Sequence, residues 1–388
     1  MKKICFVVHE FGMFKGHGGI ASYIYYLCQA ILKRYDNEFE IHVITCMYDE
    51  KNELIKNANF VLHAIEARSV EWKGAEICKL LKKIKPLWVE TSDYEGLCLE
   101  AIIDRNKGAE ELRNTAFMVI HHTASKECFE WSYSIHFHNA NICMQNIHVR
   151  EKAQYFLCDK NIFPSNFLLK YIQKNDGVRN SILLRYTYEN IYTNRKEMYQ
   201  KAEKKFDLSF FKDKFVISYI SRIEGRKNQK FLIDAYIKFK QESDCDTILI
   251  IAGNSLRNEV YGYDERERLY LSIPKEERDS ILFYDFVDKE MYKLICSVTT
   301  VAIMASVFEN FPIAMMEYVY MGIPVMASIY SGCKDYMLGH EKYMAFNPFN
   351  VYDLKEKILN FSRLSGNQQH EIAKKQYENL FNVCCEKN

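Results

Sequence analysis

Short apolar runs alternate with longer amphipathic segments along the first half of the chain. The apolar runs predict strands at residues 4–8, 40–46, 87–91, 116–121 and 181–184, and the amphipathic segments predict helices at 20–33 and 70–83. Apolar strands that alternate with helices are typical of a parallel sheet covered on both faces. The first half therefore predicts a doubly wound α/β domain.

The second half repeats this alternation after a charged stretch. Strands are predicted at 215–220, 247–252, 281–284, 300–304 and 325–328, and helices at 229–240, 264–271, 289–297, 312–321, 351–362 and 368–382. Between residues 189 and 214 the apolar pattern weakens and charge dominates, which indicates a linker. We therefore predict two α/β domains, at 1–190 and 214–388, joined by a linker at 191–213. The last helix is a candidate to pack back on the first domain.

The composition fits two folded domains and disfavours several other classes of protein. A chain of 388 residues with 48% hydrophobic residues supplies two cores, since single cores rarely grow beyond about 250–300 residues. A net charge of +1 provides no bulk field for a nucleic-acid partner. No apolar stretch reaches the roughly 18 residues of a membrane span, so only a peripheral membrane contact stays open.

The cysteines and the first residues indicate a reducing, cytoplasmic location. The 13 cysteines lie mostly in apolar runs and form no CxxC pair, which is typical of buried thiols and not of a metal site. The apolar run at residues 4–8 stops at His9 and Glu10. It is therefore shorter than the roughly 7–15 apolar residues of an export signal.

A glycine-rich turn follows the first predicted strand, with the sequence Gly16-His17-Gly18-Gly19 just before a helix. Glycines allow the backbone to approach a ligand closely, and the N–H groups at a helix start attract negative charge. The turn is therefore a candidate to bind a phosphate or an anionic acceptor. Because it is not the GxGxxG dinucleotide motif, a plain strand-to-helix turn is the alternative.

Three cations follow the first strand of the second domain, namely Arg222, Arg226 and Lys227. Ligands of open α/β sheets bind beyond the carboxyl ends of the strands, which is where this loop lies. Arg222, through a forked pair of hydrogen bonds, and Lys227, as a point charge, are candidates to converge on one diphosphate. Solvated surface cations are the alternative.

Two glutamates flank the start of a predicted helix in the second domain. Glu309 lies in the loop after the strand at 300–304, Pro312 suits the first helical position, and Glu317 lies further along the helix. A carboxylate accepts hydrogen bonds from two vicinal hydroxyls, so these glutamates are candidates to hold a sugar and a ribose. The N–H groups at the helix start would face negative charge on a leaving phosphate. A helix cap and an ion-paired surface are the alternatives for Glu309 and Glu317.

Together these residues resemble the retaining glycosyltransferases of family 4, which have the GT-B fold. The hallmark of that family is a glutamate followed by seven residues and a second glutamate, which is the spacing of Glu309 and Glu317. The flanking residues are similar as well, with Phe311-Pro312 after the first glutamate and the sequence at 322–325 after the second. The glycine turn and residues 90–96 and 119–123 resemble features of the family's N-terminal domain, so the likeness covers most of the chain.

The resemblance implies two Rossmann-like domains that face each other across a cleft. Residues 1–190 would lie on the acceptor side, and residues 214–388 would bind the nucleotide sugar. The implied reaction transfers a hexosyl or N-acetylhexosaminyl group, with retention, from a nucleotide diphosphate sugar to a glycan, lipid-linked or other hydroxyl acceptor. A UDP-sugar is favoured over a GDP-sugar as the donor. Neither a cofactor nor a metal ion is expected, because Arg222 and Lys227 would take the place of the metal ion.

Carried over position by position, the resemblance assigns a role to each candidate residue. Arg222 and Lys227 neutralise the donor diphosphate, Glu309 contacts the transferred sugar, and Glu317 binds ribose hydroxyls. His122 faces the donor sugar, with His121 beside it as the alternative register. Further ligand contacts are implied for Gly18 and Gly19 in the glycine turn, for Phe286 and Val287 at the nucleobase, and for Asn310, Phe311 and Ile313 at the helix start.

Some positions depart from the family, and two other functions stay open. Ser221 replaces a usual glycine, Tyr318 replaces a usual alanine, and Asp335 stands where a glutamate is common. The GT-B fold also hosts a non-hydrolysing sugar-nucleotide 2-epimerase, which would need acid–base carboxylates such as Asp93 and Glu95. A degenerate protein that only binds a sugar nucleotide is the second alternative. The aromatic segment at 129–138 either stacks on a sugar or packs as core.

Overall fold

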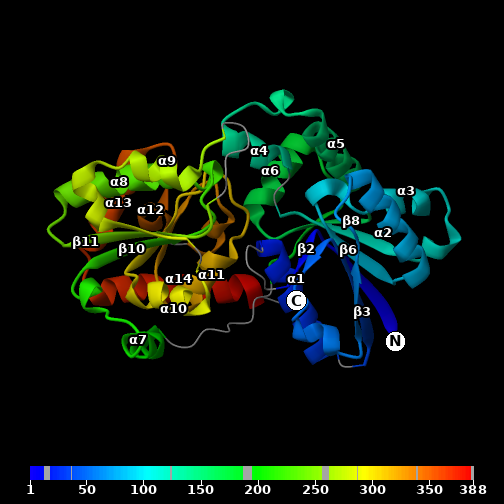
Figure 1. Ribbon diagram of the computed structural model, residues 1–388, viewed down its shortest axis with the longest axis horizontal. Coiled ribbons are helices and arrows are strands. Elements are labelled where there is room, and N and C mark those ends of the chain that lie inside the picture. The colour runs from blue at the N-terminus through cyan, green and yellow to red at the C-terminus, as the bar shows by residue number, and fades with distance from the viewer. Residues whose placement is uncertain are drawn as a thin grey trace. The chain divides into compact units, whose positions relative to one another are not determined.

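The computed structural model describes residues 1–12, 18–35, 37–122, 125–186, 195–255, 262–285, 287–337 and 340–385 (Figure 1). The chain divides into two compact units by its internal contacts. Unit 1 comprises residues 1–130 and 135–189, and unit 2 comprises residues 131–134 and 190–388. Each unit is built on its own parallel sheet.

The sheet of unit 1 has the strand order β5-β3-β1-β6-β7-β8-β9, and all neighbours are parallel. The strands are β1 (Lys2–Val7), β3 (Phe39–Thr45), β5 (Phe60–Ala64), β6 (Trp88–Ser92), β7 (Ala116–Ile120), β8 (Lys160–Phe163) and β9 (Ser181–Leu183). From the central pair β1 and β6, the chain adds β3 and β5 on one side and β7, β8 and β9 on the other. The carboxyl ends of β1 and β6 therefore form the switch point of this sheet, where ligands of doubly wound folds bind.

Helices connect these strands, and polar side chains fix several helix starts. The helices are α1 (Gly19–Arg34), α2 (Val70–Ile84), α3 (Leu99–Asn106), α4 (Ser125–Tyr133), α5 (Ile142–Leu157) and α6 (Asn166–Asp176). The side chains of Ser69, Asn141 and Ser165 accept hydrogen bonds from backbone N–H groups in the first turns of α2, α5 and α6. Such caps satisfy N–H groups that have no partner within the helix. Beside the main sheet, β2 (Glu10–Phe11) pairs in parallel with β4 (Met47–Tyr48).

The sheet of unit 2 has the order β12-β11-β10-β13-β14-β15, so its switch point lies beyond β10 and β13. Its strands are β10 (Phe215–Ile220), β11 (Thr247–Ala252), β12 (Ile281–Tyr284), β13 (Val301–Met304), β14 (Val325–Ser328) and β15 (Ala345–Phe346). Every residue of β10 and β11 is buried, because helices lie on both faces of the sheet. In Figure 1, α8 and α13 lie on one side of β10 and β11, and α10 and α11 lie on the other.

Six helices of unit 2 follow the predicted pattern, whereas α7 and α12 were not predicted. The helices of unit 2 are α7 (Arg195–Glu203), α8 (Gln229–Glu242), α9 (Glu265–Leu271), α10 (Lys289–Val298), α11 (Ile313–Tyr320), α12 (Glu341–Met344), α13 (Val351–Ser362) and α14 (Gly366–Cys385). The last helix, α14, packs against α11 within unit 2. The side-chain amide of Gln376 on α14 also hydrogen bonds both the N–H and the C=O of Val325.

The predicted fold class is confirmed, because both units are doubly wound α/β domains with parallel sheets. The pattern missed β5, β8 and the two-residue strand β15 of the two main sheets, and it also missed the helices α3, α4, α5 and α6. The stretch interpreted as linker contains α7, which packs against α10 and buries Met198 and Ala202. In the part of the chain that the structure describes, no helix is long and apolar enough to cross a membrane.

Four carboxyl groups of unit 1 are almost inaccessible to water and have raised pKa values. The exposed fractions of Glu90, Asp93, Glu127 and Glu151 are 5%, 1%, 4% and 0%. Burial raises the pKa of Glu90, Asp93 and Glu127 to about 7, and it raises the pKa of Glu151 to about 8 with a further contribution from Asp93. These groups therefore hold protons in the folded unit that free carboxyls would release.

Gly96 allows a tight approach of two segments in unit 1. It has a φ of +59°, and a Cβ at this position would lie 2.8 Å from the backbone carbon of Arg150. Gly177 has a similar φ of +67°, but no heavy atom lies within 4 Å of its Cβ position. The two glycines share the backbone conformation and differ in available space.

We expect Gly96→Ala to lower the free energy of unfolding of unit 1 by more than Gly177→Ala does. Both changes place a side chain in the left-handed region, at a cost of about 1–2 kcal/mol. Gly96→Ala adds overpacking of about 1–3 kcal/mol. Urea titrations followed by the fluorescence of Trp72 and Trp88 measure the difference. Equal losses in the two variants would contradict the proposed clash with Arg150.

We expect unit 1 to lose stability as the pH rises from 6.5 to 8. Free carboxyls are ionised in the unfolded chain over this range, whereas the raised pKa values keep protons bound in the folded unit. Burial lowers the pKa of His121 to about 4 and of His122 to about 3, so both imidazoles are neutral in the folded unit. In the unfolded chain they lose their protons at about pH 6.5, so their opposing contribution is confined to the lower end of this range. Each carboxyl that retains its proton only when folded contributes a slope of up to about 1.4 kcal/mol per pH unit.

The matched variant for this prediction is Asp93→Asn, which has the shape of the protonated acid and cannot ionise. Urea titrations at pH 6.5 and 8 should show a smaller stability difference for the variant than for the parent protein. A parent whose stability rises with pH over this range would refute the prediction.

Candidate functional site

The switch point of unit 2 brings together two loops that are distant in the sequence. The 3₁₀ helix η6 (Gly225–Lys227) follows β10, and Glu309 lies in the loop after β13. Because β10 and β13 are parallel neighbours, both loops leave the same edge of the sheet. This is the position in which doubly wound folds bind ligands.

A buried carboxylate and two buried cations meet at this edge. The Nζ of Lys227 donates a hydrogen bond to Oε2 of Glu309, and the Nη1 of Arg226 lies 3.3 Å from the same oxygen. The exposed fractions of Arg226, Lys227 and Glu309 are 4%, 9% and 8%. A buried charge is tolerated when it is paired in this way. The cluster formed by Arg226, Lys227 and Glu309 is called the buried triad below.

Arg222 and Glu224 extend the buried triad toward solvent. Oε1 of Glu224 accepts a hydrogen bond of 2.9 Å from Arg226 and lies 3.6 Å from Nη2 of Arg222. The Arg222 side chain is half exposed, with a relative accessibility of 50%. Three cations thus stand against two carboxylates, which leaves an excess positive charge suited to an anion.

The charges around Glu309 keep its carboxylate ionised. Burial would raise the pKa of Glu309, but the charges of Lys227 and Arg226 outweigh burial and hold that pKa at about 2. The hydroxyl of Ser306 donates a 3.3 Å hydrogen bond to Glu309 and itself pairs with the hydroxyl of Tyr219 at 2.8 Å. Glu309 is therefore fixed as a hydrogen-bond acceptor.

The backbone around Glu309 is held as firmly as its side chain. Its N–H donates to the carbonyl of Tyr330 at 3.1 Å, and its own carbonyl accepts from the N–H of Gly332 at 3.1 Å. The carbonyl of Arg226 accepts from the N–H of Val307 at 3.0 Å. The loops after β10, β13 and β14 thus form one hydrogen-bonded rim.

The other predicted donor contacts of this unit lie on or near α11. Pro312 is the residue before the helix and not its first residue, because α11 starts at Ile313. Asn310 and Phe311 are both 3% exposed, and Glu317 is partly exposed on the second turn of α11. Val287 lies just before α10 and is partly exposed, whereas Phe286 lies outside the described residues.

His122 and His121 of unit 1 have different environments. His121 is fully buried, bonds Asn161 at 2.9 Å through Nε2, and stacks on Phe163 with 4.1 Å between ring centroids. His122 is 9% exposed, and its ring hydrogen bonds and stacks on Tyr186. His121 therefore belongs to the core, and His122 is the better candidate to face a ligand.

The amide of Gly18 already has an anionic partner. Gly18 is the N-cap of α1 and Gly19 is its first residue, while Gly16 and His17 lie outside the described residues. The N–H of Gly18 donates to Oε1 of Glu10 at 2.7 Å. The Gly18 N–H group, which the sequence suggested as a donor to a phosphate or an anionic acceptor, thus donates to a carboxylate of the protein itself.

The structure brings Lys227, Glu309 and, through Glu224, Arg222 into one cluster. Sequence reasoning gave Arg226 no role, although it is the second cation on Glu309. The only signal was its position between Arg222 and Lys227, because burial of an arginine is not visible in a sequence. Among the described side chains, no group of three or more His, Cys, Asp or Glu is placed to hold a metal ion.

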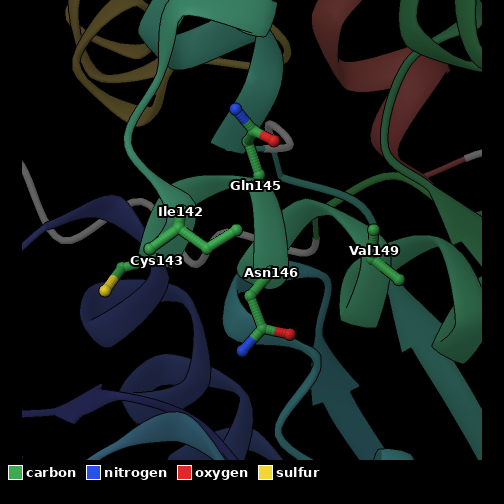
Figure 2. A pocket seen from close by; sticks show the side chains of 5 residues that line it. All are labelled: Ile142, Cys143, Gln145, Asn146 and Val149. Carbon is green, nitrogen blue, oxygen red and sulfur yellow. The ribbon is translucent and has the colours of Figure 1, made fainter.

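One described pocket lies away from this cluster, in unit 1. A pocket of about 480 Å³ is lined by residues of α5 in unit 1, which Figure 2 shows: Ile142, Cys143, Gln145, Asn146 and Val149. Its walls carry no ionisable carboxyl, lysine or arginine group. This pocket contains none of the predicted site residues, and the chemistry of a charged donor is not supported there.

Residues 200–379 match the family described as Glycosyl transferases group 1. The sucrose-phosphate synthase of Thermosynechococcus elongatus superposes with a TM-score of 0.73 and 16% identity, over 99% of this chain and 95% of that one. HepE of Anabaena, solved in complex with UDP and glucose, gives 0.71 and 14% identity over 100% and 98%. A glycosyltransferase of Rickettsia africae gives 0.69 and 15% identity over 98% and 94%.

One relative also matches by sequence alone. The sucrose synthase of Melioribacter roseus is 21% identical over an alignment of 168 residues, which covers 38% of this chain and 20% of that protein. The chain therefore spans about a fifth of the length of this relative. Solved structures with identities this low establish the fold alone. The family match concerns residues 200–379, which lie in unit 2. Residues 200–379 thus match the family of Glycosyl transferases group 1, and the chain as a whole has the GT-B fold of these solved structures.

Proposed function

We propose that the protein is a retaining glycosyltransferase that transfers a sugar from a nucleotide diphosphate sugar to a hydroxyl acceptor. The observation that supports this most strongly is the buried triad with Arg222 beside it, at the switch point of unit 2. A cluster with excess positive charge suits a diphosphate, and an ionised carboxylate within it suits sugar hydroxyls. The match to glycosyl transferases group 1 adds independent support.

The chemistry follows from where negative charge develops. The bond between the anomeric carbon and the diphosphate oxygen breaks, while the acceptor hydroxyl oxygen bonds to that carbon. Its proton passes to the departing diphosphate, so no protein nucleophile is required. Arg222 and Lys227 stabilise the charge on the leaving group, which is the part that a metal ion plays in other transferases.

The donor is proposed to be a UDP-sugar. HepE, which has the same fold, was solved with UDP and glucose. In this chain Glu317 is proposed to bind the ribose hydroxyls, with Val287, Asn310, Phe311 and Ile313 around the nucleotide, and His122 is proposed to face the sugar. Buried free thiols such as Cys5 and Cys28 suit a reducing compartment, so we place the protein in the cytoplasm.

The epimerase alternative is not favoured by the carboxylates of unit 1. Glu95 forms a buried ion pair with Lys73, which keeps it ionised and unable to act as an acid. Asp93 is 1% exposed and accepts a hydrogen bond from the backbone N–H of His122 at 3.1 Å. Asp93 is therefore too deeply buried to exchange a proton with a sugar ring, and Glu95 has no proton to donate to one.

We expect Lys227→Ala and Arg222→Ala each to lower donor turnover by about 10²-fold or more, the scale of losing one charge-stabilising donor. The control is Lys230→Ala, because Lys230 lies three residues later on α8 and pairs with Asp234 at its own helix surface. Turnover is measured as release of nucleoside diphosphate, with circular dichroism as the check on folding. A correctly folded Lys227→Ala protein with near-normal turnover would remove the assignment.

We expect UDP-sugars to raise the melting temperature more than GDP- or ADP-sugars, because a ligand of the native state stabilises it by mass action.

We further expect Glu317→Ala to weaken UDP binding by about 1–3 kcal/mol, measured by calorimetry, because hydrogen bonds to a charged group are lost. The control is Glu276→Ala, which changes an exposed carboxylate in η7 (Lys275–Ser280), before β12 and thus at the opposite edge of the sheet. Unchanged UDP affinity in Glu317→Ala would exclude the ribose contact.

A further inference from the structure

The switch point of unit 1 carries a second cluster of ionisable groups that the donor chemistry does not use. His9 and Glu10 follow the end of β1, and Glu95 follows the end of β6. Val7 and Thr91 are register partners at the carboxyl ends of these strands. As a result, Nδ1 of His9 and Oε2 of Glu95 lie 3.3 Å apart, although 86 positions separate the two residues.

Glu95 is held in a costly backbone conformation. Its φ of 65° lies in the left-handed region, which costs a non-glycine residue about 1–3 kcal/mol. Its N–H donates to Oε1 of Glu151 at 3.1 Å, and its carbonyl accepts from Nε of Arg150 at 3.4 Å. The conformation persists because both sides of the residue are fixed, and it aims the carboxylate at His9.

Lys73 and His9 share the Glu95 carboxylate. Nζ of Lys73 donates to Oε2 of Glu95, and the two side chains are only 4% and 8% exposed. Burial raises the pKa of Glu95, but hydrogen bonds from His9 and Lys73 outweigh burial and leave that pKa below its ordinary value. Nδ1 of His9 is engaged with the Glu95 carboxylate, which leaves Nε2 as the ring nitrogen available to bond a hydroxyl group.

His9 is rigid and yet accessible. Its carbonyl accepts hydrogen bonds from the N–H groups of Cys46 and Met47 at 3.2 and 3.1 Å and from the hydroxyl of Thr45 at 3.1 Å. The edge of its ring packs on Tyr94 with 5.7 Å between centroids. Its side chain nevertheless remains 28% exposed. A fixed and accessible polar atom is what recognition of a hydroxyl requires.

Glu10 adds a second carboxylate to the same edge. Its Oε1 accepts from the N–H of Gly18 at 2.7 Å, and a Cβ on Gly18 would lie 2.4 Å from that oxygen. Glu10 therefore occupies the start of α1, the place where an acceptor phosphate would find N–H groups. The balancing cation, Lys73, is buried.

We propose that His9, Glu10 and Glu95 form a binding site for the hydroxyl groups of an unphosphorylated saccharide acceptor. This inference rests on the proposed glycosyl transfer and specifies the class of acceptor. The three side chains offer hydrogen-bonding atoms, which suit hydroxyl groups, and the two carboxylates repel a phosphate. A metal ion is a poorer occupant, because the described residues include no group of three or more side chains placed to bind one.

The experiment compares matched acceptors that differ only in charge. Glucose, mannose and fructose are each offered beside the corresponding 6-phosphate, with the nucleotide sugar that gives the largest thermal shift. Transfer is measured as kcat/KM for each acceptor, and hydrolysis of the donor by water is measured separately. We expect the neutral sugar of a pair to be preferred by about tenfold or more, because like charges at a binding site are unfavourable.

Two variants separate the effect of the Glu10 charge from the effect of the hydrogen bond made by His9. Glu10→Gln keeps an oxygen for the N–H of Gly18 and removes the charge, so it should reduce the preference for the neutral sugar several-fold. His9→Ala should raise the KM for the acceptor several-fold. Glu38→Gln changes an exposed carboxylate just before β3, at the opposite edge of the sheet, and should alter neither quantity.

Failure of this inference and failure of the proposed function give different results. If no nucleotide sugar produces a thermal shift or is hydrolysed, the proposed function is wrong, and the inference falls with it. If the donor binds normally but a 6-phosphate is used as well as or better than its neutral partner, the acceptor assignment is overturned. Transfer to no sugar of any pair, or an unchanged acceptor KM in His9→Ala, overturns it as well.

Discussion

The candidate site depends on one buried ionic contact, in which the carboxylate of Glu309 is held between Lys227 and Arg226. Burying a carboxylate costs several kcal/mol unless cations and hydrogen bonds surround it. The loops after β10, β13 and β14 are tied together around this contact by backbone hydrogen bonds. The positive charge left over beside Arg222 is therefore fixed in place before any ligand arrives, which is the condition for electrostatic stabilisation without reorganisation.

The two units use the same topological position for opposite chemistry. In each sheet the strand order reverses between two central strands, and ionisable side chains gather at their carboxyl ends. In unit 2 the loops present cations, which suit the anionic half of a nucleotide sugar. In unit 1 they present an imidazole and two carboxylates, which suit neutral hydroxyls. We propose that one architecture thus provides a donor-type site and an acceptor-type site, through the residues that follow a few strands.

Both sites are maintained by interactions that would be unfavourable alone. Glu309 and Lys227 are buried charges, and Glu95 has a left-handed backbone. Each persists because its neighbours fix it from several sides, as Ser306 and Tyr330 do for Glu309 and as Glu151 and Arg150 do for Glu95. Strain and burial concentrated at the ends of parallel strands are typical of functional sites, where rigidity serves recognition.

The sequence by itself determined what depends on local pattern. The alternation of apolar and amphipathic segments predicted two α/β domains, and the spacing of Glu309 and Glu317 indicated the family. The sequence did not determine which charges are buried together, so the role of Arg226, the contact of Glu10 with Gly18 and the pairing of His9 with Glu95 were all missed. These contacts join residues 8 to 86 positions apart. Only the tertiary structure decided them, because strand order and loop closure, and not local periodicity, determine which side chains meet at the edge of a sheet.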